Sequence, residues 1–278
     1  MTGHKRPLNR TKVMQPATND LLTRKVSPVF MFANKDYAQI FQSDDDRKEF
    51  FAAVSKMCQL MQKGGVPFTV HDDIFIWFRS LFWMRDPKFV EAMQGFEDDV
   101  VLRARAWRIH NLCWALSQAA HIEGDVVDIG CYEAKSTAVF CNYNESLILA
   151  KNLYLYDYFD APEGDHKKHL HGPHLAAKVE ERMRKYRPVV VQGSVLETIP
   201  RQLPDEICFA HIDLNGHEAE AHVMPEVYER MPRGAILVFD DYGFSRYRES
   251  GLAHQRFLEG KPERILELPT GQGLLIKL

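Results

Sequence analysis

The feature that most constrains this fold is a series of five short apolar runs after Gly124, each bounded by Gly, Pro or Asp. They are DVVDIG (125–130), LYLYD (153–157), PVVVQG (188–193), ICFAHID (207–213) and GAILVFD (234–240). The runs are continuous rather than alternating, which indicates strands buried on both faces, and the spacers between them are long enough for helices. The pattern predicts an α/β fold in which helices cover both faces of a parallel sheet.

The chain ends with two more strand-like runs around a Gly-rich turn, in RILELPTGQGLLIKL (264–278). Two strands joined by so short a turn pair in antiparallel fashion. A parallel sheet that finishes in such a hairpin has one antiparallel strand. We therefore expect one sheet-forming domain over residues 124–278.

The region 31–123 is expected to be a helical extension. Phe50, Val54 and Met57 recur at three- and four-residue steps after an acidic start that suits a helix N-terminus. Residues 100–120 predict a long helix that places the side chains of one apolar stripe together, namely Leu102, Trp107, Ile109, Leu112 and Leu116. The aromatic-rich run 72–84 indicates either a second helix or a packed hairpin of short pieces.

Residues 1–30 form a basic segment with little apolar periodicity, and we expect a flexible arm. The whole chain carries 35 Lys and Arg against 38 Asp and Glu, a formal charge of −3, which gives no electrostatic case for a nucleic-acid partner. It contains no run of about 18 apolar residues, so no membrane-spanning segment is expected.

The five cysteines form an odd set without a CxxC pair, and the N-terminus lacks the apolar stretch of a signal peptide. Both features favour a reduced, cytoplasmic setting. The apolar content of residues 31–123 is compatible with a homodimer.

Carboxylates follow four of the five apolar runs, at Asp128, Asp157, Asp213 and the pair Asp240 and Asp241. Ligands of open α/β sheets bind beyond the carboxyl ends of the strands. Like charges gathered at one edge repel one another unless a cation or a polyhydroxyl ligand separates them. The sequence therefore predicts a ligand site at this edge of the sheet.

The first turn, VVDIGCYEAKST (126–137), lacks the GxGxxG pattern that lets a dinucleotide pyrophosphate approach the backbone. This disfavours NAD binding. Ser136 and Thr137 offer hydroxyls at the start of the next helix, and Asp157 is placed to bind ribose hydroxyls.

These motifs occur in the order seen in class I S-adenosylmethionine-dependent methyltransferases, and they most resemble the macrocin O-methyltransferase group. The matching segments are VVDIGCYEAKST, LYDYFDAPEG, VVQGSVLETIP, HIDLN, VFDDYG and LPTGQGLLIK, all within residues 124–278. The resemblance implies a Rossmann-like sheet of strand order 3-2-1-4-5-7-6 with strand 7 antiparallel.

The same resemblance implies a set of site residues. S-adenosylmethionine would be held by Asp128, Gly130 and Ser136 at its amino-acid end, by Asp157 at the ribose, and by Gly193 and Ser194 beside the adenine. A magnesium ion would be bound by Asp213, Asp240 and Asp241, and such oxygen ligands suit a hard cation. Two positions depart from the family pattern: Ala134 stands where glycine is usual, and Asn215 stands where a second aspartate is common.

Methyl transfer to a hydroxyl needs a base, and the sequence offers two, Asp213 and His217. His211 is expected to be a core histidine, because it alternates with Asp213 along a strand. Phe244 is expected to pack in the interior and Tyr242 to contact the acceptor. The His-rich segment with His166, His169, His171 and His174 is expected to form a lid over the cofactor rather than a metal site.

The function expected is magnesium-assisted O-methyl transfer to a small molecule, such as the sugar or aryl group of a natural product. Two alternatives stay open. One is a methyltransferase-like protein that binds S-adenosylmethionine without turnover, which the change at Asn215 favours. The other is an NAD(P)-dependent Rossmann oxidoreductase, which the missing GxGxxG disfavours.

Overall fold

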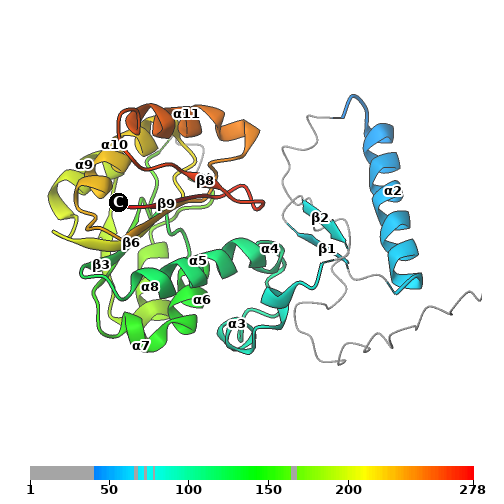
Figure 1. The fold of residues 1–278 in the computed structure, drawn as a ribbon, viewed down its shortest axis with the longest axis horizontal. Coiled ribbons are helices and arrows are strands. Elements are labelled where there is room, and N and C mark those ends of the chain that lie inside the picture. The colour runs from blue at the N-terminus through cyan, green and yellow to red at the C-terminus, as the bar shows by residue number, and fades with distance from the viewer. Residues whose placement is uncertain (1–40, 66–67, 72–73, 78, 164–167) are drawn as a thin grey trace, which may run out of the picture.

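The computed structural model describes residues 41–65, 68–71, 74–77, 79–163 and 168–278 (Figure 1). The expected arm at 1–30 and His166 of the expected lid lie outside these residues. Within the described ranges, no helix combines the length and the apolar character needed to cross a membrane.

A seven-stranded sheet with the order β5-β4-β3-β6-β7-β9-β8 forms the centre of the described fold. β3 to β7 are parallel, and β9 runs antiparallel to both β7 and β8. In order along the sheet this is the predicted 3-2-1-4-5-7-6 arrangement, and the antiparallel strand 7 is confirmed. The strands are β3 (Asp125–Ile129), β4 (Leu153–Asp157), β5 (Val189–Gln192), β6 (Ile207–Ile212), β7 (Ile236–Phe239), β8 (Leu266–Glu267) and β9 (Gly273–Ile276).

Helices cover both faces of this sheet, as predicted (Figure 1). Alternate residues of the strands other than β8 enter two separate apolar clusters, so Val126 packs on one face and Val127 on the other. The first face is covered by α5 (Ala106–Ala119), α6 (Lys135–Tyr143) and α8 (Leu175–Met183), with α7 (Glu145–Ile148) and the short η3 (Arg184–Tyr186) beside them. The second is covered by α9 (Val195–Gln202), α10 (His217–Glu229) and α11 (Arg248–Phe257), which follows η4 (Ser245–Tyr247).

The chain changes direction across the sheet at β3, which pairs with β4 on one side and β6 on the other. This creates a switch point, where neighbouring strands leave space for a ligand beyond their carboxyl ends. The register places Asp128 of β3 directly beside His211 of β6, on the same face. The predicted site therefore lies where the topology favours one.

The N-terminal extension differs in part from the helical prediction. α2 (Asp44–Lys63) begins where expected, at the capping residue Ser43, whose hydroxyl accepts a hydrogen bond from the Asp46 amide. A β-hairpin of β1 (Phe68–His71) and β2 (Ile74–Trp77) follows it, so of the two alternatives for the run 72–84 the structure has a hairpin at Ile74–Trp77. FTVH and IFIW are rich in aromatic and β-branched residues, which fit a strand better than a helix.

The expected helix over 100–120 is divided into α4 (Val100–Ala104) and α5, with Arg105 at the break. The remaining elements of the extension are η2 (Phe82–Arg85) and α3 (Pro87–Ala92), which begins with Pro87 after the capping residue Asp86. Leu102, Ile109, Leu112 and Leu116 are buried and Trp107 is half-buried, so four of the five residues of the predicted apolar stripe lie in the core.

Gly130 connects β3 to the first turn in a conformation that only glycine adopts easily, with φ of +90°. A Cβ at this position would lie 1.9 Å from the carbonyl oxygen of Asp213. Glycine is therefore required here because the ends of β3 and β6 approach each other closely.

Gly130→Ala should lower the free energy of unfolding by about 3 kcal/mol or more, because strain and a backbone clash act together. Gly95→Ala is the matched control, since Gly95 has φ of +87° and no heavy atom within 4 Å of the added Cβ. That change should cost only about 1–2 kcal/mol. Urea denaturation of both variants measures the difference, and equal losses would contradict the close approach at Gly130.

Candidate active site

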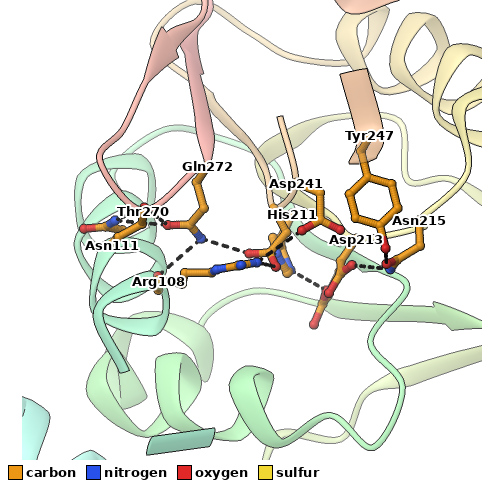
Figure 2. Close-up of polar contacts among 11 residues, drawn as sticks. Arg108, Asn111, His211, Asp213, Asn215, Asp241, Tyr247, Thr270 and Gln272 are labelled. Carbon is orange, nitrogen blue, oxygen red and sulfur yellow. Dashed lines mark hydrogen bonds and ion pairs between the residues drawn. The ribbon is translucent and has the colours of Figure 1, made fainter. Parts of the chain in front are cut away.

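The centre of the candidate site is an ion pair between α5 and the end of β7 (Figure 2). Arg108 Nη1 lies 2.7 Å from Asp240 Oδ2 and 3.2 Å from Asp241 Oδ1. The Arg108 and Asp240 side chains are only 7% and 8% exposed. Arg108 therefore bridges two of the acids that were predicted to bind a metal ion.

His211 joins this ion pair to β3. Its Nδ1 lies 2.9 Å from Asp128 Oδ1 and its Nε2 lies 3.6 Å from Asp240 Oδ1. Burial lowers the pKa of His211, but the carboxylates of Asp128 and Asp240 outweigh it and hold the pKa well above its ordinary value. The expectation of a core histidine is incomplete: the residue is buried, but it is a charged member of the site.

The C-terminal hairpin closes the site with a buried polar network (Figure 2). Gln272 Nε2 donates to Asp240 Oδ1 at 3.0 Å, and its Oε1 accepts from Asn111 Nδ2 at 3.0 Å. Asn111 Nδ2 also lies 3.1 Å from Thr270 Oγ1. The turn between β8 and β9 is thereby tied to both α5 and the end of β7.

Asp213 lies at the end of β6 with its own partners. Asn215 Nδ2 donates to Asp213 Oδ1 at 2.8 Å, and the Tyr247 hydroxyl donates to Asn215 Oδ1. An aspartate at 215 would have no donor for this role, so asparagine here orients Asp213.

The acids of the site differ in pKa. Burial and then the charge of Asp240 raise the pKa of Asp213 to about 6. Burial and the negative charges of Asp213 and Asp240 raise the pKa of Asp241 to about 7. Burial works against ionisation of Asp240 as well, but Arg108 and His211 hold its pKa far below the ordinary value. The site thus combines a permanently ionised acid with two that titrate near neutrality.

These residues do not fit a magnesium ion. Arg108 is bonded to both Asp240 and Asp241, while Gln272 takes the other Asp240 oxygen and Asn215 takes one oxygen of Asp213. In the described part of the chain, no group of three or more His, Cys, Asp or Glu side chains is arranged to hold a metal. The metal assignment stays a prediction that this geometry does not support.

The residues predicted to bind the cofactor lie along the ends of β3, β4 and β5. Asp128 is buried and bonded to Thr137 and His211, so its carboxylate holds the first turn together. Ser136 is half-buried in the first turn of α6. Gly193 has φ of +136°, and Ser194 precedes α9.

Asp157 ends β4 as a buried carboxylate. Its Oδ2 accepts from the Tyr132 amide at 2.8 Å, and its Oδ1 accepts from the Phe159 amide at 3.2 Å and faces His171 Nε2 at 2.9 Å. Burial raises its pKa, but the contact with His171 and these amides lowers it below the ordinary value. His171 of the His-rich segment thus lies against Asp157 at the end of β4.

Three further predictions concern side chains near Asp213. His217 is exposed at the first position of α10, and among the described residues no hydrogen bond or ion pair joins it to Asp213. Phe244 packs on Arg108, with its ring centre 4.4 Å from the guanidinium carbon, which agrees with the packing role. The Tyr242 hydroxyl accepts from Gln255, and its ring packs against His254 and Gly273.

Sequence reasoning missed a buried acid–base pair between α10 and α11. His254 Nε2 lies 3.3 Å from Glu220 Oε2, and the His254 ring stacks on Phe239 at 4.0 Å. Burial, Asp241 and Asp213 raise the pKa of Glu220 to about 8, and burial lowers that of His254 to about 4. Both side chains are therefore neutral near pH 7. The signal available in the sequence was Glu220, a glutamate on the apolar side of the helix pattern at residues 217–229.

Glu220→Gln should stabilise the protein at high pH. Folding raises the pKa of Glu220 from 4.5 to about 8, so its contribution to stability is complete below pH 4.5 and is lost as the pH rises toward 8. The variant should exceed the wild type by about 1–3 kcal/mol at pH 8.5 and match it within about 1 kcal/mol at pH 5. Denaturant unfolding at both pH values measures this, with the exposed Glu218→Gln as control. A difference independent of pH would refute the assignment.

Comparisons with known proteins bear on the fold and on residues 127–242. Residues 127–242 match the family model described as a methyltransferase domain. No curated protein sequence matches the chain.

Several solved structures share the fold. The O-methyltransferase NovP has a TM-score of 0.51 at 13% identity, over 61% of this chain and 79% of its own. The calicheamicin methyltransferase CalS11 has a TM-score of 0.56 at 17% identity, over 70% of this chain and 88% of its own. A second structure of CalS11, described as a TDP-rhamnose 3'-O-methyltransferase, has a TM-score of 0.50 at 19% identity, over 70% of this chain and 89% of its own. Residues 127–242 are therefore similar to a methyltransferase domain, and the chain shares the fold of the O-methyltransferase NovP and the methyltransferase CalS11.

Proposed function

We propose that this protein transfers the methyl group of S-adenosylmethionine to a hydroxyl of a small molecule. The observation that carries the proposal is Asp213, a carboxylate with a pKa raised to about 6, at the carboxyl end of β6 beside the switch point. A base that titrates near the working pH is suited to taking a hydroxyl proton. The methyltransferase domain in which Asp213 lies supports the choice of methyl donor.

S-adenosylmethionine would supply a methyl group on a positively charged sulfur. Asp157 suits its ribose, because the carboxylate is ionised and sits beside the first turn at the end of the neighbouring strand. A carboxylate has about four acceptor positions. The Tyr132 and Phe159 amides and His171 face three of them, so a ribose diol would share the carboxylate with His171 or replace that contact.

The chemistry required of the chain is modest. The acceptor oxygen forms a bond to the methyl carbon as the carbon–sulfur bond breaks, and that bond's electron pair remains on sulfur. The hydroxyl proton passes to Asp213. Asn215, held by Tyr247, fixes one Asp213 oxygen and leaves the other to face the acceptor. The protein accelerates the reaction by aligning the methyl donor, the acceptor hydroxyl and the base.

A sugar or aryl hydroxyl of a natural product is the acceptor class that we propose. The names of NovP and CalS11 describe O-methyltransferases, and that of CalS11 includes a TDP-rhamnose substrate, which supports a sugar hydroxyl. Magnesium is not part of this proposal, because Arg108 occupies the acids that would hold it. We also propose that the partners include neither nucleic acid nor membrane, that the protein works in the cytoplasm, and that a homodimer forms.

Asp157→Asn should weaken the binding of S-adenosylhomocysteine about 10- to 100-fold, because a ribose diol would lose its charged acceptor, worth roughly 1.5–3 kcal/mol. Asp160→Asn, on the same loop and paired with Lys168, is the control and should bind normally. Calorimetry measures both affinities. Unchanged affinity in Asp157→Asn would remove Asp157 from the ribose site.

Asp213→Asn should lower kcat by about 10²- to 10⁴-fold while leaving the affinity for S-adenosylhomocysteine intact. His217→Ala should change kcat by less than about five-fold, since an exposed side chain contributes little to a proton transfer made elsewhere. The wild-type kcat should fall as the pH drops below about 6, where Asp213 gains a proton.

The assay is methyl transfer to glycosylated phenols and nucleotide sugars, followed from pH 5 to pH 9. The opposite pattern, a large loss in His217→Ala and a mild effect in Asp213→Asn, would assign the base to His217. No transfer to any hydroxyl compound, with normal cofactor binding, would favour the binding protein without turnover.

A further inference from the structure

The acidic cluster at the ends of β6 and β7 contains its own cation. Arg108 reaches it from α5, and a single nitrogen, Nη1, contacts one oxygen of Asp240 at 2.7 Å and one of Asp241 at 3.2 Å. A divalent ion bound through these same two oxygens would occupy the position of Arg108 Nη1. The guanidinium and such an ion therefore compete for one position.

The guanidinium is held on its other sides as well. The Phe244 ring packs on it at 4.4 Å. Gly271, with φ of +80°, leaves room for that ring, since a Cβ there would lie 2.2 Å from a Phe244 carbon. Gln272 Nε2 lies 3.4 Å from the Arg108 carbonyl oxygen as well as 3.0 Å from Asp240 Oδ1. Arg108 is thus built into the site by both α5 and the C-terminal hairpin.

The acids beside Arg108 are also bonded to protein donors. Asp240 Oδ1 accepts from Gln272 and faces His211, and Asp213 Oδ1 accepts from Asn215. Magnesium demands near-ideal octahedral geometry with oxygens at about 2.0–2.1 Å. To supply those oxygens, the site would have to release Arg108 and break several of these hydrogen bonds.

We propose that Arg108 is the resident cation of this site and takes the place of a divalent metal ion. It is a positioning residue: it fixes Asp240 and Asp241 beside Asp213 rather than acting on the reacting atoms itself. A guanidinium keeps its charge over the whole working pH range. The role of Asp213 rests on the proposed function, whereas the occupation of the site by Arg108 does not.

Direct titration with Mn²⁺, followed by electron paramagnetic resonance on protein dialysed against EDTA, tests the proposal. The full-length wild type should bind no Mn²⁺ with a Kd below about 1 mM. Arg108→Ala frees the acids and should bind one Mn²⁺ per chain at least about ten-fold more tightly than the wild type. Mn²⁺ should raise the unfolding temperature of that variant by about 2 °C or more and leave the wild type unchanged.

Two variants control for charge and for position. Arg108→Lys keeps a cation and should resist Mn²⁺ as the wild type does. Arg105→Ala removes an exposed cation just before α5 that acts on the same acids through its charge, and because the Arg108 guanidinium stays between Asp240 and Asp241 this variant should also bind no Mn²⁺. Mn²⁺ binding by Arg108→Lys as tight as by Arg108→Ala would show that the cation does not exclude the metal.

The wild type alone can overturn the proposal, even if Arg108→Ala fails to fold. One Mn²⁺ bound per wild-type chain, with a Kd below about 0.1 mM and lost in Asp241→Asn, would place a metal ion where we place Arg108. Binding of S-adenosylhomocysteine is measured on the same samples. If S-adenosylhomocysteine does not bind, the proposed function is contradicted. The Mn²⁺ result would still decide whether Arg108 occupies the site.

Discussion

The buried ion pair between Arg108 and Asp240 is the interaction on which the rest of the site depends. It joins residues 132 positions apart in the chain and fixes α5 against the end of β7. Gln272 adds the C-terminal hairpin, and His211 adds β3 through Asp128. Removing one partner of a buried pair leaves an uncompensated charge, which costs about 3–5 kcal/mol. Stability and function are therefore coupled at this point of the fold.

This pairing also separates the acids into two kinds. Asp128 and Asp240 face the cations His211 and Arg108, and the pKa of Asp240 is far below its ordinary value. Asp213 lacks such a close cation, and its pKa of about 6 leaves it able to exchange a proton near neutrality. Groups whose environments push their pKa values apart are the usual basis of acid and base roles. Burial and the charge of Asp240 therefore make Asp213 the candidate base, against the opposing charges of His211, Arg105 and Arg108.

The sheet was predictable from the sequence because buried parallel strands are continuous apolar runs, as in 207–213 and 234–240. The carboxylates at the strand ends were predictable because they directly follow these apolar runs in the sequence. The role of Arg108 was not predictable from the sequence. Helical periodicity predicts that polar residues are exposed, and Arg108 is buried because α5 packs on β7. His211 alternates correctly for the interior, but no pattern shows that two acids surround it. A hairpin was only one of two alternatives for the run 72–84, because short aromatic runs fit both structures, and the strand Phe68–His71 lay outside that prediction.

A crystal structure with S-adenosylhomocysteine and Mn²⁺, recorded at the manganese absorption edge, tests the central claim most directly. The account predicts the ribose against Asp157, the Arg108 guanidinium between Asp240 and Asp241, and no anomalous peak at those acids. An anomalous peak among Asp213, Asp240 and Asp241 with Arg108 displaced would contradict it.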